Sequence, residues 1–84
     1  MSFTIRYMAR LRDDLGVDQE NFIPSIQCAN VAELILQLPE RGPRWRALLN
    51  DPSVMVALNK AMVARNSPIR SGDEIAFLPP VTGG

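Results

Sequence analysis

The hydrophobic period of the chain changes twice, from two residues to between three and four and back to two, and this order limits the fold more than any other feature. Apolar and other side chains alternate in FTIRYMA, residues 3–9, as in a half-buried strand. In NVAELILQLPERG, residues 30–42, apolar positions recur at i, i+3, i+4 and i+7, one stripe of a helix. Alternation returns in SVMVAL, residues 53–58, and in EIAFL, residues 74–78. A mixed, open sheet must therefore cover its apolar face with one amphipathic helix, which predicts an α+β roll.

Local signals predict where the other elements begin and end. Asn30 can cap the long helix, with Glu33 in the position of a capping box. Pro24 marks the second strand as an edge strand or a bulge, and Asn59 with Lys60 predicts a tight turn. The expected helices cover residues 10–16, 31–38 and 43–51, and the expected strands cover residues 3–9, part of 19–26, 54–58, 61–65 and 74–78.

Length and charge exclude several classes of protein. A chain of 84 residues has room for one small core, so we expect one domain. Nine basic residues balance nine acidic ones without a block of like charge, so we expect neither a nucleic-acid groove nor a site for an anionic membrane. Neither a membrane helix nor a signal peptide is recognisable, and we expect a cytoplasmic protein.

The chain has no histidine and a single cysteine, Cys28. Histidine is the commonest general base and metal ligand, and a lone thiol can build neither an internal disulfide nor a thiolate metal cluster. We expect Cys28 to be a buried structural thiol. Since no pair of nucleophile and base can be named, we do not expect catalysis by this chain alone.

The last six residues, PPVTGG, form a distinct segment after the final apolar strand. Two prolines fix φ near the polyproline value, so the segment should leave the sheet extended and reach ~20 Å at ~3.3 to 3.6 Å per residue. Gly83 and Gly84 carry no side chains, so the terminal carboxylate can pass through a narrow channel and its carbonyl carbon stays open to attack. We therefore expect a folded domain at residues 1–78, an extended tail at residues 79–84, and chemistry done to the tail's own end.

Alternation also predicts an apolar surface beside this tail. Met8 and Leu78 point away from the inward sets of their strands and should lie on the uncovered face of the sheet, where we expect Met62 to join them. An exposed apolar patch is typical of a protein interface, and methionine adapts to more than one partner.

Two stretches carry a resemblance to a known family. GDEIAFLPPVTGG, residues 72–84, resembles the C-terminal signature of the small subunit of molybdopterin synthase, the MoaD family of sulfur carriers, and ALNKAMV, residues 57–63, resembles its other recurrent stretch. Between Asp18 and Asn30 the match is loose. The resemblance implies the β-grasp, or ubiquitin-like, fold: a mixed sheet of about five strands packed on one main helix plus short helices.

The resemblance further implies a reaction at Gly84. An adenylyltransferase related to ubiquitin-activating enzymes would use ATP and Mg²⁺ to adenylate the carboxylate, and a sulfur donor, a cysteine desulfurase or a rhodanese-type protein, would convert it to a thiocarboxylate. The tail would then enter the large subunit of the synthase and give its sulfur to precursor Z to form the molybdopterin dithiolene. This chain itself would bind no cofactor and no metal.

The resemblance implies partner contacts as well. The family assembles as a heterotetramer, with two small subunits at opposite ends of a large-subunit dimer. Both the activating enzyme and the large subunit recognise a hydrophobic surface of the small subunit. The residues implied for these contacts are Met8, Met62, Leu78, Pro79, Pro80, Val81 and Thr82.

Two other functions stay open at the level of sequence. The chain could be a related carrier for thiazole or cysteine synthesis, or a protein modifier whose Gly84 is joined to lysine amines, because all these uses begin with adenylation. It could also be a binding module whose flexible glycine end is inert, since most chain termini are disordered. The two prolines and the absence of charge after Glu74 favour a tail that is buried in a partner.

Overall fold

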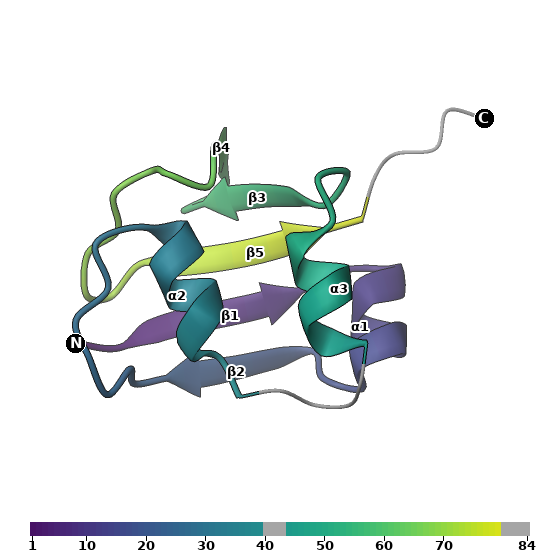
Figure 1. Ribbon diagram of the computed structural model, residues 1–84, viewed down its shortest axis with the longest axis horizontal. Helices are drawn as coiled ribbons and strands as arrows, with labels where there is room; N and C mark the ends of the chain where they lie inside the picture. Colours follow the sequence, from purple (N-terminus) through teal and green to yellow (C-terminus); the bar gives the residue numbers. More distant parts are fainter. Residues whose placement is uncertain (40–43, 80–84) are drawn as a thin grey trace.

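A computed structural model of the chain describes residues 1–39 and 44–79. Each predicted helix and strand is present in the predicted order (Figure 1). The elements are β1 (Phe3–Tyr7), α1 (Arg10–Leu15), β2 (Gln19–Phe22), α2 (Val31–Gln37), α3 (Trp45–Asn50), β3 (Met55–Leu58), β4 (Ala61–Val63) and β5 (Glu74–Leu78).

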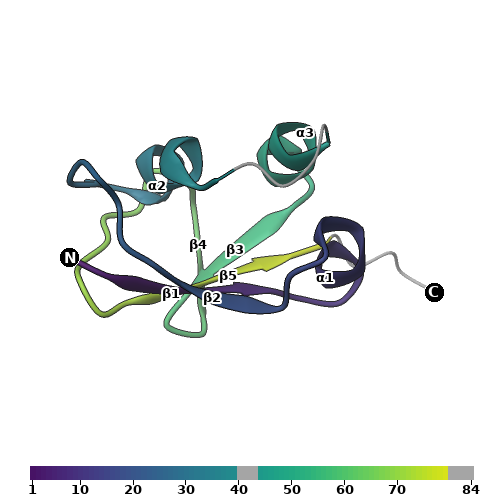
Figure 2. The ribbon, with the colours of Figure 1, turned by 90° about the horizontal axis from the view of Figure 1, so that it is seen from below.

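The strands form one mixed sheet in the order β2-β1-β5-β3-β4. The first and last strands, β1 and β5, are parallel neighbours with Tyr7 opposite Phe77, and the other adjacent pairs are antiparallel. Figure 2 shows α2 and α3 over one face of the sheet, and no helix of the described residues over the other face. α1 lies at the end of the sheet where β1 and β5 finish (Figures 1 and 2). The predicted α+β roll of the β-grasp type is confirmed.

The core lies between the sheet and the two covering helices. The ring of Tyr7 stacks on Phe77 with centroids 5.8 Å apart and meets Trp45 edge-on at 5.4 Å. Its hydroxyl donates to Glu20 Oε2 at 2.7 Å, which satisfies the polar end of a buried aromatic side chain. The predicted inward alternation is confirmed, because the buried side chains include Phe3, Ile5, Tyr7, Val56, Ile75 and Phe77 from the strands and Val31, Leu34, Ile35 and Leu49 from the helices.

The predicted cap of α2 is confirmed with one difference. Asn30 Oδ1 accepts a hydrogen bond from the backbone N–H of Glu33 at 2.9 Å. The Glu33 carboxylate accepts from the N–H of Ala29 at 3.1 Å, one residue earlier than in the usual capping box. The first contact satisfies an N–H group that a helix start leaves without an intrahelical partner, and the second ties the residue before the cap to the helix.

The turn between β3 and β4 is also as predicted. Asn59 and Lys60 both have left-handed backbones, with φ of 49° and 73°, as a two-residue hairpin with a primed turn requires. The side chain of Asn59 accepts from the N–H of Glu74 at 2.9 Å and donates to Asp73 at 3.0 Å. The turn is thereby fixed to the start of β5.

The prediction that β4 runs from residue 61 to residue 65 is wrong at its end. β4 stops at Val63, because the backbone then turns toward the start of α2. The carbonyl of Arg65 accepts from the N–H of Ala32 at 2.9 Å, and that of Ser67 accepts from the N–H of Val31 at 3.3 Å. These contacts join segments far apart in the sequence, so alternation could not reveal them.

Two other strand boundaries are corrected. β1 ends at Tyr7 and not at residue 9, because the backbone changes direction at Ala9, which has a positive φ of 51° and leads into α1. β2 is an edge strand, as predicted, but it ends at Phe22, so Pro24 lies beyond it and forms no bulge within it.

Candidate functional site

The candidate site begins where β5 leaves the sheet. β5 occupies the middle of the sheet and ends at Leu78, and Pro79, half-buried, continues the chain. β1 runs parallel to β5 and ends at the same side, so its last residues flank this exit. The other residues of the predicted tail, Pro80, Val81, Thr82, Gly83 and Gly84, lie outside the described residues.

Strand register brings apolar side chains together on the face that the helices leave open. Leu78 pairs with Met55 across the β3–β5 ladder. The N–H of Met8 donates to the carbonyl of Phe77 at 3.0 Å, which sets Met8 beside Leu78. Met62 lies on the edge strand β4 and pairs with Ala57, which is two residues along β3 from Met55. We call Met8, Met55, Met62 and Leu78 the open-face patch.

Exposure differs among the members of the patch. Met55 and Met62 are 42% and 53% exposed, whereas Met8 and Leu78 are half-buried. Between them, Ala57 and Ala76 pair across the β3–β5 ladder and are almost buried. Two short alanine side chains therefore lie among the longer methionine and leucine side chains of the patch. Such a surface can hold apolar side chains of a partner, and it supplies no group for acid–base chemistry.

Sequence reasoning missed two residues of this face, Met55 and Arg6. The alternation that placed Leu78 outward also places Met55 outward, so this signal was present in the sequence. Arg6 lies between Gln19 of β2 and Ala76 of β5, and its Nε is buried without a hydrogen-bond partner among the described residues. Its place beside the patch depends on the parallel pairing of β1 with β5, which no local pattern gives.

The comparison with known proteins assigns the family. The sequence matches the ThiS family over residues 5–84, nearly the whole chain. The chain belongs to the ThiS family. A ThiS-family relative from Haemophilus influenzae, named molybdopterin synthase sulfur carrier subunit, is 32% identical over 80 residues, which covers 95% of this chain and 96% of that protein. The family resemblance found in residues 72–84 and 57–63 is thus confirmed.

Solved structures agree with the ThiS-family assignment. SAMP1 from Haloferax volcanii superposes with a TM-score of 0.80 over 100% of both chains, and at 23% identity this likeness shows the fold alone. A protein–protein complex of subunits 1 and 2 of the molybdopterin-converting factor from Helicobacter pylori contains a chain that is 28% identical, with a TM-score of 0.61 over 100% of both chains.

The single cysteine of this ThiS-family chain is structural, as predicted. Cys28 is buried, its thiol donates to the carbonyl of Ile26 at 3.7 Å, and the side-chain N–H of Gln37 donates to its sulfur at 3.2 Å. Burial, and to a smaller extent the charge of Glu33, raises the pKa of the Cys28 thiol. The thiol therefore stays protonated at neutral pH and is a poor nucleophile.

Within residues 1–39 and 44–79, no three His, Cys, Asp or Glu side chains are grouped so that they could hold a metal ion. Among the helices that these ranges contain, none has the length and hydropathy needed to cross a membrane. The open-face patch next to the exit of β5 is therefore the candidate site that the described part of this ThiS-family chain offers.

Proposed function

We propose that this protein is the sulfur-carrying small subunit of molybdopterin synthase. The observation that carries the proposal is the end of β5: this central strand finishes directly beside the open-face patch, and the PPVTGG segment follows it in the sequence. A partner that seats on the patch lies at the point from which the tail departs. The name of the Haemophilus influenzae relative, at 32% identity over 95% of the chain, supports the same function.

The chemistry takes place at the carboxyl end of Gly84. A ubiquitin-activating-like adenylyltransferase, using ATP and Mg²⁺, joins the carboxylate to AMP and releases pyrophosphate. Sulfur at the sulfide level, delivered by the sulfur donor, then displaces AMP to leave a thiocarboxylate. The absence of a Cβ at Gly84 keeps the carbonyl carbon accessible to the incoming sulfur. Because the chain has no histidine, the acid and base groups for these steps come from the partner enzymes.

The acceptor partner is the large subunit of the synthase. The tail, residues 79–84, enters its active site and gives sulfur to precursor Z, two sulfurs being needed for each dithiolene. The Helicobacter pylori complex of two molybdopterin-converting-factor subunits supports a partner of this kind. The assembly is a cytoplasmic heterotetramer with small subunits at the two ends of a large-subunit dimer.

The intact mass of the untagged chain tests the proposal. After incubation with ATP, a sulfur donor and the activating enzyme of the source organism, we expect a gain equal to replacement of one oxygen by sulfur, located at Gly84 by fragmentation. The matched control is the same chain without Gly84, which should keep its mass. No gain in the full chain, in a reaction that converts a known carrier, would contradict the proposal. A branched Gly-Gly peptide on lysines of other proteins would instead indicate a modifier.

A further inference from the structure

Arg6 places a positive charge in the middle of the open face of the sheet. Ile5 and Tyr7, its neighbours along β1, are fully buried under the helices, so Arg6 between them points to the opposite face. Strand register sets Arg6 between Gln19 of β2 and Ala76 of β5. Arg6 therefore shares the surface of the open-face patch, two residues along β1 from the patch member on that strand.

The inner and outer nitrogens of the Arg6 guanidinium differ in exposure. Nε is buried without a hydrogen-bond partner, but neither Nη1 nor Nη2 belongs to the buried unpartnered atoms of the described chain. Arg6 makes no hydrogen bond and no ion pair within residues 1–39 and 44–79. Since Nη1 and Nη2 are neither bonded nor buried, they are the part of this half-buried side chain that solvent or a partner can reach.

The carboxylates nearest to Arg6 in the sheet are engaged elsewhere or set apart from it. Glu20 of β2 lies on the covered side, where it accepts the hydroxyl of Tyr7 at 2.7 Å. Glu74 pairs with Thr4 across the β1–β5 ladder, which places it diagonal to Arg6, and the two form no ion pair. Within the part of the chain that the structure describes, the charge of Arg6 is therefore not paired.

A protein that docks on the open-face patch must also cover Arg6. Arg6 pairs with Ala76, which lies among the patch residues, so the two surfaces are continuous. Removal of water from a charged group costs free energy unless the partner supplies acceptors. A carboxylate is the best match, because it can accept one hydrogen bond from each of two guanidinium nitrogens and both bonds are charge-assisted.

We propose that a carboxylate side chain of the large subunit accepts hydrogen bonds from Nη1 and Nη2 of Arg6 when the large subunit docks on the open-face patch. Arg6 is then a specificity-determining residue, because a partner that places apolar groups against it would bury its charge without compensation. This inference rests on the proposed function, in which the large subunit receives the tail beside the patch.

The sign of an affinity change tests the contact. Calorimetry measures the affinity for the large subunit, which Arg6→Leu should weaken about tenfold and Arg6→Lys should weaken less. The matched control, Arg70→Leu, removes the same charge from an exposed residue before β5 and should change affinity by less than about twofold. Tighter binding by Arg6→Leu would show that the large subunit covers Arg6 with apolar groups, and would overturn the proposal.

A double-mutant cycle identifies the carboxylate. The wild type and Arg6→Leu are each titrated with large subunits whose surface aspartates and glutamates are replaced one at a time by their amides. One replacement should weaken binding of the wild type about tenfold and leave binding of Arg6→Leu unchanged. Equal effects of every replacement on both chains would contradict the pair. Coupling of Arg6 to a carboxylate of the activating enzyme alone would show that the large subunit is the wrong partner.

A second measurement needs no substitution. The side-chain ¹⁵N resonances of Arg6 in the wild type should shift and exchange more slowly with solvent when the large subunit is added, and unchanged resonances in a saturated complex would contradict the contact. If the wild type gains sulfur and binds the large subunit, but Arg6→Leu binds equally well, this inference fails and the proposed function stands. If the wild type does not bind the large subunit at all, the proposed function itself fails.

Discussion

Neighbouring residues of β5 face opposite sides of the sheet, and we expect one to contribute to stability and the other to docking. Phe77 is fully buried against Tyr7 under the helices, whereas Leu78 is half-buried on the open face opposite Met55. Burial of Phe77 stabilises the fold, and the exposed part of Leu78 is available to a partner. Substitution of each residue should therefore separate stability from docking.

Leu78→Asp should abolish measurable binding to the large subunit, because it places a charge within the open-face patch. The cost in stability should be on the order of 1 kcal/mol, or about 4–8 °C in Tm for a domain of this size. Calorimetric titration and thermal unfolding measure the two effects. The control is Phe77→Ala, which should cost about 3–5 kcal/mol through the cavity that it leaves. Wild-type affinity in Leu78→Asp would contradict a docking role for the patch.

Cys28 should make the free energy of unfolding decrease as the pH becomes alkaline. Because its pKa is raised in the folded state above the ordinary value of 9.0, the buried neutral thiol stabilises the fold fully below that pH. This contribution is lost as pH rises through the folded-state pKa, since the Cys28 thiol ionises at a lower pH in the unfolded chain than in the folded protein. Urea unfolding between pH 7 and pH 10.5 should therefore show a steeper loss in the wild type than in Cys28→Ala. Parallel curves for the two proteins would show that the thiol does not ionise differently on folding.

At the scale of elements, the stability of a short helix depends on the hydrogen bonds that cap its ends. α2 has seven residues, fewer than an isolated helix needs in water, so its cap and its packing must hold it. Asn30→Ala should lower the free energy of unfolding by about 1 kcal/mol, because it removes the acceptor for the N–H of Glu33. Chemical denaturation measures this loss. Asn50→Ala, at the exposed end of α3, is the matched control and should change stability by less than about 0.5 kcal/mol.

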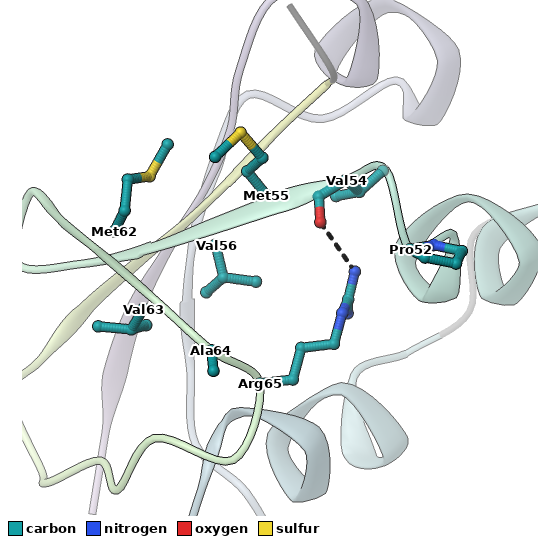
Figure 3. Close-up of a pocket in the computed structure, with 8 residues that line it drawn as sticks. All are labelled: Pro52, Val54, Met55, Val56, Met62, Val63, Ala64 and Arg65. Carbon is teal, nitrogen blue, oxygen red and sulfur yellow. Dashed lines mark hydrogen bonds between the residues drawn. The ribbon is translucent and has the colours of Figure 1, made fainter.

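Elements that follow local patterns could be predicted from the sequence, and features made by distant contacts could not. The stripe of Val31, Leu34 and Ile35 predicts α2, because each spacing lies within two helical turns. The end of β4 depends on the pairing of Arg65 with Ala32, more than thirty residues away along the chain. Beyond this end, β3 and β4 diverge around a pocket lined by residues that include Val54, Met62 and Arg65 (Figure 3), and no periodicity could reveal it.

The open-face patch was partly predictable for the same reason. Alternation gives the face to which Met8 and Leu78 point, which is a local property of each strand. Which side chains lie next to them depends on the order β1-β5-β3, and this brings in Met55 and Arg6. The expectation of chemistry at the carboxyl end came from the two terminal glycines and from the family resemblance, and it stays a prediction, because residues 80–84 lie outside the described residues.

At the scale of the whole molecule, the proposed function puts the reaction at Gly84, six residues in sequence beyond the end of the last strand. Deletion of Gly84, or addition of one alanine after it, should abolish sulfur transfer to precursor Z, because the reacting carbonyl is removed or displaced. Thermal unfolding should be unchanged, since β5 ends at Leu78. The control is an alanine added before Met1, which should leave both activity and Tm intact. Full activity in either Gly84 variant would support an inert terminus instead.

The parallel pairing of β1 with β5 also has a mechanical consequence. β1 begins and β5 ends at opposite ends of the sheet, so a pull between Phe3 and Pro79 acts along both strands (Figure 1). Their hydrogen bonds lie across the direction of pulling and must shear together, whereas bonds loaded from one end would open one after another. An enzyme that draws the tail into a channel therefore meets its stiffest resistance in the same strand pair that anchors the tail.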